Sequence, residues 1–172
     1  MEKKKNLHKR LDTPVVSDAD VIIQLSKLDR LHILRSLYTK IAIPEYVKCE
    51  IMQKECNDIQ RAIGSYLTVH RISNEKAIQF AEKYGIHIGE AHVKILGDIL
   101  KSNLMLSNER KVRRIARQEG FHVAGTIGII LKAYRTHLIN RDDILSILHR
   151  MKDDEFWIHP DLIQKAISSV SY

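Results

Sequence analysis

The stretch that most constrains this chain runs from Val15 to Ile23, where an apolar segment ends in two acids and turns into a helix. Residues 15–16 indicate the end of a buried strand. Asp18 and Asp20 follow, and from Val21 the apolar residues take the spacing of an amphipathic helix. Ligands of open α/β sheets bind outside the carboxyl ends of the strands. The stretch therefore predicts an α/β fold with a site at this edge.

The rest of the chain repeats this alternation of short apolar strands and helices. Further strands are expected at 40–44, 67–72, 104–106 and 121–124, and helices at 20–28, 30–37, 45–55, 57–65, 75–84, 89–102, 109–119, 126–137, 141–152 and 160–169. This pattern predicts a three-layer α/β/α sandwich with a short central parallel sheet. Asn74 is expected to cap one helix, and Ser107-Asn108 another.

Length and composition fit one domain and an anionic partner. The 172 residues divide into a basic, flexible tail over 1–14 and a domain over 15–172. A net charge of +7 favours nucleic acid, while 6% aromatic residues argue against binding by base stacking. Because no stretch reaches the ~18 apolar residues of a membrane span, we expect a cytoplasmic protein without a membrane partner.

Acids follow several of the predicted strands and therefore should meet at one edge of the sheet. Besides Asp18 and Asp20, they are Glu50 after the strand at 40–44, Glu90 at a helix start, and Glu109, which follows Asn108. Clustered oxygen ligands suit Mg²⁺ or Mn²⁺. The alternative for Glu90 and Glu109 is a structural one, since acids stabilise helix N-termini.

Five blocks of the chain match, in order, a known family. They are Val15-Val16-Ser17-Asp18; Ile43-Pro44 with Val47 and Glu50-Ile51; Gly89-Glu90-Ala91; Leu104 to Arg110 with Arg113-Arg114-Ile115-Ala116; and Gly125-Thr126-Ile127-Gly128. Together they resemble the PIN-domain superfamily, and within it a group of PIN-like proteins of unknown function related to the VapC-type toxins. The resemblance covers about residues 15 to 170.

The resemblance implies a metal-dependent endoribonuclease, with RNA as substrate and Mg²⁺ or Mn²⁺ as cofactor. It also implies the toxin of a toxin–antitoxin pair, a small antitoxin as partner, and a homodimer. By position, Asp18, Glu50 and Glu90 match the family's catalytic acids, and Glu109 is the fourth. The metal set would comprise Asp18, Asp20, Glu50, Glu90, Asn108 and Glu109.

The chain departs from the family at two places. The family usually has Asp at one or both positions held here by Asn108 and Glu109, and a small polar residue where Asp20 stands. An amide brings no charge, so Asp20 either restores the lost charge or disturbs the site. These departures keep open a second function, a catalytically impaired PIN-like module that binds RNA or a partner.

Other motifs have competing interpretations. Asp18-Ala19-Asp20-Val21 fits the DxD motif of haloacid-dehalogenase-like phosphatases, but no later paired-Asp motif follows a predicted strand. The helix at 109–119 carries a basic set that either contacts RNA phosphates or is a solvated face: Arg110, Lys111, Arg113 and Arg114. His87 and His92 are expected to have a structural or surface role. Phe156 and Trp157 either cap the core or form a dimer contact.

Overall fold

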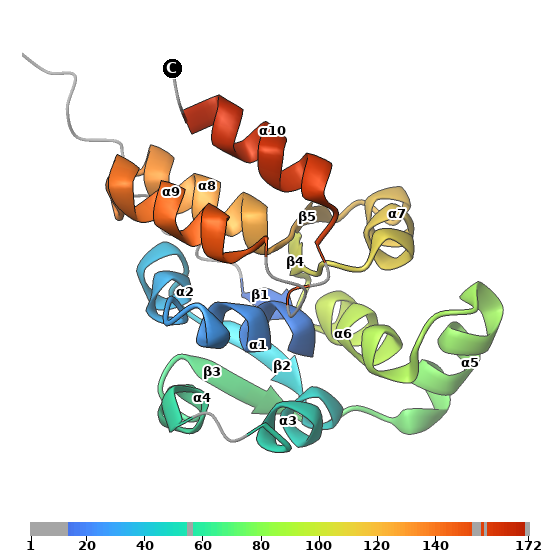
Figure 1. Cartoon of the computed structure of the whole chain (residues 1–172). Coiled ribbons are helices and arrows are strands. Elements are labelled where there is room, and N and C mark those ends of the chain that lie inside the picture. The colour runs from blue at the N-terminus through green and yellow to red at the C-terminus, as the bar shows by residue number, and fades with distance from the viewer. Residues whose placement is uncertain (1–13, 55–56, 153–155, 157, 171–172) are drawn as a thin grey trace, which may run out of the picture.

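A single parallel sheet organises the molecule. The computed structural model describes residues 14–54, 57–152, 156 and 158–170. The strands are β1 (Val15–Ser17), β2 (Ile41–Pro44), β3 (Leu67–His70), β4 (Leu104–Leu106) and β5 (His122–Ala124). They pair in the order β3-β2-β1-β4-β5, all parallel, so β1 is the central strand (Figure 1). The predicted basic tail lies outside the described residues, apart from Pro14.

The central strand is short but covered on both faces. Val16 pairs with Ala42 of β2 and Met105 of β4, and all three side chains are buried. A parallel strand covered on both faces is apolar along its whole length rather than alternating, as Val15 and Val16 are here. Because every strand pairing is parallel, the carboxyl ends of all the strands lie at one edge of the sheet. The predicted short parallel sheet is confirmed.

The helices divide between the two faces of the sheet. Right-handed connections place the helices that lead from β1 towards β3 on one face, and those that lead from β3 to β4 and β5 on the other. The first set is α1 (Ala19–Lys27), α2 (His32–Leu37), α3 (Glu45–Met52) and α4 (Asn57–Ala62). The second set is α5 (Asn74–Tyr84), α6 (Ile88–Ile99) and α7 (Arg110–Gln118). The α/β/α sandwich is thus confirmed (Figure 1).

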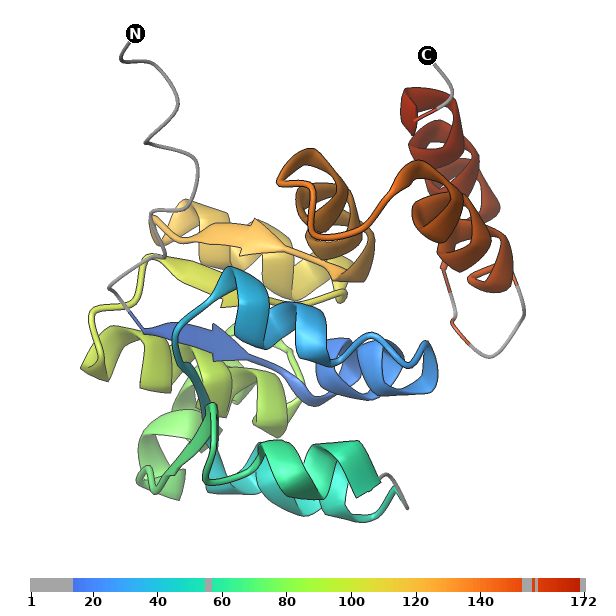
Figure 2. The same ribbon diagram turned by 90° about the vertical axis from the view of Figure 1, so that its left-hand side faces the viewer.

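The C-terminal helices extend the first layer. They are α8 (Thr126–Arg135), α9 (Arg141–Arg150) and α10 (Pro160–Val170). Helix α8 packs on α1 and α2, whereas α9 and α10 pack on α8 and on each other (Figure 2). The carbonyl oxygen of Phe156, in the connection between α9 and α10, accepts a hydrogen bond from Gln24 of α1. The Phe156 side chain is buried in the core, which favours the core-capping interpretation, while Trp157 lies outside the described residues.

Two predicted helix caps were wrong. Ser73, in an extended conformation, precedes α5, and Asn74 is already its first helical residue. Glu109 caps α7, because its side chain accepts a hydrogen bond from the Lys111 backbone N–H. The side chain of Asn108, expected to cap α7, instead accepts a hydrogen bond from the Thr126 N–H at the start of α8. Cap positions follow from backbone angles, which a list of preferred residues does not fix.

Close packing sets the position of α6, the helix that carries Glu90. A Cβ atom on Gly97 would lie 2.7 and 2.9 Å from ring carbons of Phe121, which enters β5. Buried Lys94 donates to Asp98 on the same helix at 2.7 Å and to Glu119 beyond α7 at 3.2 Å. These contacts hold α6 against the neighbouring strand and helix.

Candidate active site

The exits of β1 and β4 are joined directly at the carboxyl edge. The backbone N–H of Asp18 donates to the carbonyl of Leu106 at 3.0 Å. Asp18 caps α1, since its Oδ1 accepts from the Val21 N–H at 3.0 Å. The residues that follow β4, beginning with Ser107, therefore lie next to Asp18. The sheet topology alone brings two of the predicted site segments together.

Asp18 is a buried acid in an unfavourable place for a charge. Its residue is only 7% exposed. Burial raises the pKa of the Asp18 carboxyl to about 7, partly offset by the Ser107 hydroxyl and the Val21 N–H, and the acids Asp20 and Glu90 raise it further. Burial and neighbouring negative charges both disfavour the ionised form of this carboxyl. A bound cation would stabilise the ionised form, and a proton would neutralise it.

The other predicted acids lie within electrostatic range of one another. Burial raises the pKa of Glu50, and the charge of Asp20 raises it too while His87 opposes the shift. Burial likewise raises the pKa of Glu90, with contributions from Glu109 and Asp20. Asp20 is exposed at the start of α1 and acts on acids from three parts of the chain. It is thus the shared neighbour of Asp18, Glu50 and Glu90.

The carboxylates are nevertheless not gathered into a coordination sphere. Within the described part of the chain, no group of three or more His, Cys, Asp or Glu side chains is placed to hold a metal ion. Glu90 Oε2 accepts from the His87 N–H at 2.8 Å, and Glu109 Oε1 from the Lys111 N–H at 3.2 Å. Both acids therefore serve as helix caps in this conformation, as the structural interpretation expected.

Glu50 lies against the start of α6 because residue 89 is glycine. A Cβ atom there would approach Glu50 Oε2 and the ring of Tyr46, each at 3.2 Å. Glycine thus lets the α3 carboxylate come close to the helix that carries Glu90. The oxygen-only set of Asp18, Asp20, Glu50, Glu90 and Glu109 has the chemistry that Mg²⁺ and Mn²⁺ prefer. The residues fit such an ion chemically, and in this structure Glu90 and Glu109 each place one carboxylate oxygen in a helix cap.

Asn108 occupies a hydrogen-bond network that sequence reasoning missed. Its Oδ1 accepts from the Thr126 N–H at 2.9 Å. This bond caps the start of α8, because the N-cap residue Gly125 has no side chain that could do so. The Asn108 Nδ2 donates to Gln24 Oε1 and Thr126 Oγ1, each at 3.0 Å. Thr126 Oγ1 also donates to Gln24 Oε1 at 2.9 Å. An amide at position 108 therefore joins β4, α1 and α8.

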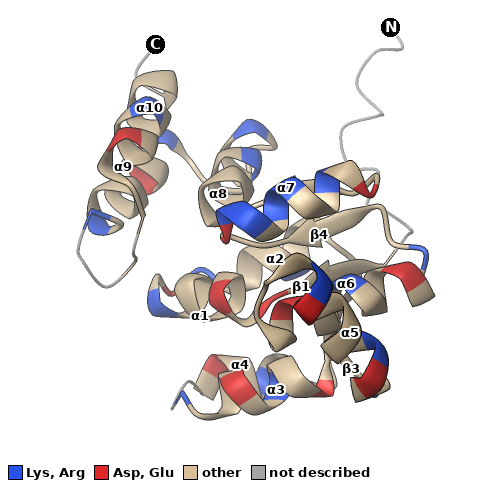
Figure 3. Ribbon diagram, turned by 90° about the vertical axis from the view of Figure 1, so that its right-hand side faces the viewer, with Lys and Arg blue, Asp and Glu red and all other residues tan. Residues whose placement is uncertain are grey.

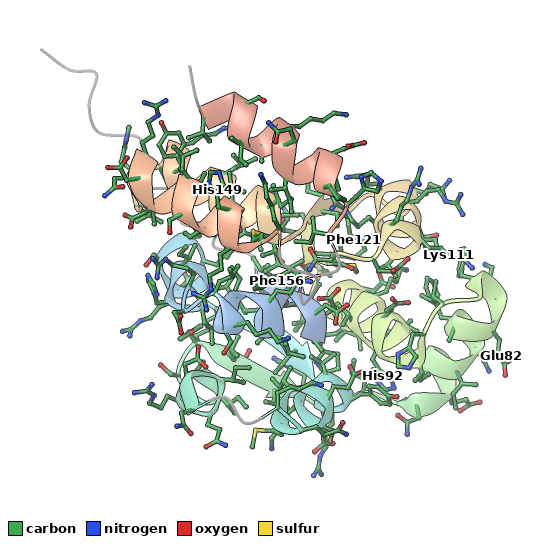
Figure 4. The ribbon with its side chains drawn as sticks, in the orientation of Figure 1. Glu82, His92, Lys111, Phe121, His149 and Phe156 are labelled. Carbon is green, nitrogen blue, oxygen red and sulfur yellow. The ribbon has the colours of Figure 1, made fainter. Side chains whose placement is uncertain are left out.

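The two histidines near Glu90 have structural roles. His87 caps α6, with its Nδ1 accepting from the Gly89 N–H at 3.2 Å. His92, a buried residue of α6 (Figure 4), stacks on Tyr46, with 5.2 Å between the ring centroids.

The predicted basic set lies along α7, which begins at the same edge. Figure 3 shows its Lys and Arg segments repeating along the helix. Arg110 and Arg114 are exposed, whereas Arg113 is half-buried. Lys111 reaches across to α5, where its Nζ donates to the carbonyl of Gly85 at 2.7 Å (Figure 4). One member of the set is therefore a structural bridge between helices.

A hollow among the described residues lies away from the acidic edge. It has a volume of about 660 Å³ and is lined by residues of α1, α2 and α4, including Ser26 and Asp58. Ser26 lies near the end of α1 opposite to Asp18 and Asp20. This hollow is therefore separate from the acidic edge.

The chain matches a known protein family over most of its length. The sequence profile described as a PIN domain matches residues 14–172. The chain belongs to the PIN-domain family. The crystal structure of PAE2754 from Pyrobaculum aerophilum superposes on this PIN domain with a TM-score of 0.51 and 13% identity, covering 80% of this chain and 99% of the other. That likeness supports the fold alone. No curated protein matched the chain.

PIN domains are generally nucleases, and they typically depend on divalent metal ions. This membership leaves the phosphatase alternative without support. Asp143, in the Asp142-Asp143 pair late in the chain, takes part in the capping of α9 by Asn140. In the described residues, no helix is long and apolar enough to cross a membrane.

Proposed function

We propose that this PIN domain is a divalent-metal-dependent endoribonuclease. Its Mg²⁺ or Mn²⁺ would be held at the carboxyl edge by Asp18, Asp20, Glu50, Glu90 and Glu109. The observation that supports this best is the buried Asp18 carboxyl at the end of the central strand, with a pKa raised to about 7 by burial and by neighbouring acids. A bound cation would offset the repulsion that the fold imposes on these groups.

The chain's own residues would position the RNA and the ion. Asp18 would supply the central carboxylate, fixed by the Val21 N–H, and Asn108 would orient the edge through Gln24 and Thr126 rather than bind the ion. The basic residues of α7 would attract the phosphate backbone. When bound, the ion would supply an activated water and neutralise charge on the phosphodiester under attack.

The biological setting belongs to the same proposal. We infer a toxin of a toxin–antitoxin pair, on the resemblance to VapC-type toxins and the net charge of +7. A small antitoxin would then cover the acidic edge and the basic helix, and a homodimer is the expected assembly.

A second function is favoured by two observations on the same edge. The Asn108 carboxamide is already engaged by Gln24 and Thr126, and the acids stand apart within the described residues. Both are compatible with a PIN-like module that binds RNA or a partner without cutting. RNA binding that EDTA leaves unchanged, together with no cleavage, would favour this second function.

Cleavage of a single-stranded RNA in Mn²⁺ tests the leading proposal. We expect the wild type to cut the RNA, EDTA to stop the reaction, and Asp18→Asn to lower the rate by at least about 100-fold, the usual cost of a transition-state contact. Asp142→Asn, the same change at an exposed position of α9, is the matched control and should act like the wild type. Intact RNA with the wild type, or equal rates for Asp18→Asn, would contradict the proposal.

A further inference from the structure

Arg113 differs from the other cations of α7 in its surroundings. Arg110 and Arg114 extend into solvent, and Lys111 is bound to the Gly85 carbonyl. Arg113 is half-buried, and its Nη1 lies beside Gly125, where β5 ends and α8 begins. Its guanidinium therefore faces the carboxyl edge of the sheet rather than the outer face of the helix.

The absence of a side chain at Gly125 leaves the space that this guanidinium occupies. A Cβ atom at position 125 would lie 2.7 Å from Asn108 Oδ1 and 2.9 Å from Arg113 Nη1. The backbone of Gly125, with φ of −100° and ψ of 178°, is one that any residue adopts. Glycine is thus needed here for space and not for conformation. The space beside Gly125 that the guanidinium occupies adjoins Asn108. Asn108 directly follows Ser107, whose hydroxyl lies beside Asp18.

Within the described residues, the Arg113 guanidinium has no hydrogen-bond acceptor and no carboxylate partner. Glu109 is one helical turn away, but its Oε1 accepts from the Lys111 N–H. The nearby Asn108 Oδ1 accepts from the Thr126 N–H. Burial lowers the pKa of Arg113, and the charge of Arg117 lowers it further. A partly desolvated cation without an anion is unfavourable, so this position is suited to receive one.

We propose that Arg113 binds the nonbridging oxygens of the RNA phosphate that is cut at the acidic edge. The proposal rests on the proposed ribonuclease function and assigns one residue of the basic helix to the reacting group. A guanidinium presents its N–H groups as a planar fork that matches two phosphate oxygens. Because negative charge on the phosphate must be neutralised beside several acids, such a contact acts on the rate of cutting as well as on RNA affinity.

Four variants separate this role from general attraction to RNA. Arg113→Ala should lower kcat by about 100-fold, the usual loss when one charge-stabilising donor is removed. Gly125→Ala keeps every charge but presses on both the guanidinium and Asn108 Oδ1, and should lower kcat in the same direction. Arg114→Ala should raise KM and reduce the salt dependence of binding with little effect on kcat. Arg61→Ala removes one exposed charge on α4 and should change neither constant.

Equal kcat values for Arg113→Ala and Arg114→Ala, with both variants folded by circular dichroism, would overturn the assignment. If the wild type cuts no RNA, the ribonuclease function fails, and Arg113 is then judged by RNA affinity measured in EDTA. A loss at least about tenfold larger for Arg113→Ala than for Arg114→Ala, near the 1.4 kcal/mol of one strong contact, would still support a phosphate contact. Equal losses would overturn it.

Discussion

Asp18 makes the stability of the protein depend on pH. Its pKa is about 7 in the fold against a usual value of 3.8, so the folded chain holds this proton more tightly than the unfolded chain. Its contribution is therefore complete below about pH 4 and is lost as the pH rises through 7. We expect the free energy of unfolding, measured with urea in EDTA, to fall by about 2–3 kcal/mol between pH 5 and pH 8.

Asp18→Asn should remove most of this slope, since asparagine carries no charge to bury. At pH 8 the variant should be as stable as the wild type or more so, although it loses RNA cleavage. Asp142→Asn, an exposed acid on α9, should keep the slope of the wild type. An Asp18→Asn protein with an unchanged slope would mean that another group is responsible.

Asn108→Asp restores a residue that is common in the family, yet the structure predicts a loss. The wild-type Nδ2 donates to Gln24 Oε1 and Thr126 Oγ1, and a carboxylate oxygen there would face the Gln24 oxygen without a proton between them. We expect a loss of about 1–3 kcal/mol in urea unfolding at pH 7, the cost of unsatisfied buried polar groups.

The matched control for this change is Asn57→Asp, which places the same acid at the exposed start of α4 and should change stability by less than about 0.5 kcal/mol. If Asn108→Asp leaves stability unchanged and raises the rate of RNA cleavage, position 108 is a metal ligand and not a structural bridge.

At the scale of single residues, the sequence predicted which acids follow which strands but not where their side chains point. Asp18 could be placed because an acid directly after a central strand has little choice of direction. The side chains of Glu90 and Glu109 could not be placed, because an acid at a helix start can either cap the helix or bind a metal ion, and the sequence is the same in both cases. Gln24 and Thr126 had no motif of their own. The spacing of Gly125 and Asn108 in the sequence gives no sign that they touch.

Among the elements, α6 is fixed by its close approach to Phe121. Gly97→Ala would place a methyl group 2.7 Å from the Phe121 ring, so we expect thermal unfolding to show a loss of about 1–3 kcal/mol from overpacking. Gly128→Ala in α8 is the control, because its Cβ would meet nothing closer than Ala124 at 4.0 Å.

That control should raise stability by about 0.5–1 kcal/mol, since alanine favours the helix. If both variants had the same melting temperature as the wild type, the contact between α6 and Phe121 would not restrain the helix. Because α6 carries Glu90, Gly97→Ala should also slow RNA cleavage if the helix shifts to accept the methyl group.

At the level of elements, most of the fold could be predicted from the alternation of apolar runs and helical spacing. The five strands, the parallel sheet and the helices on both faces agree with that pattern. Differences were confined to ends, such as β3, which stops at His70 rather than at residue 72. Strand order could not be read from the pattern, because short apolar strands have little to distinguish one neighbour from another.

For the whole molecule, the central claim is that acids from distant parts of the chain share one divalent ion at the carboxyl edge. Soaking crystals of the wild-type protein in Mn²⁺ and locating the ion by its anomalous scattering tests this most directly. We expect one strong peak in contact with Asp18, with Glu90 and Glu109 turned from their helix caps towards it. No peak at Asp18, or a peak only at a site away from these acids, would contradict the claim.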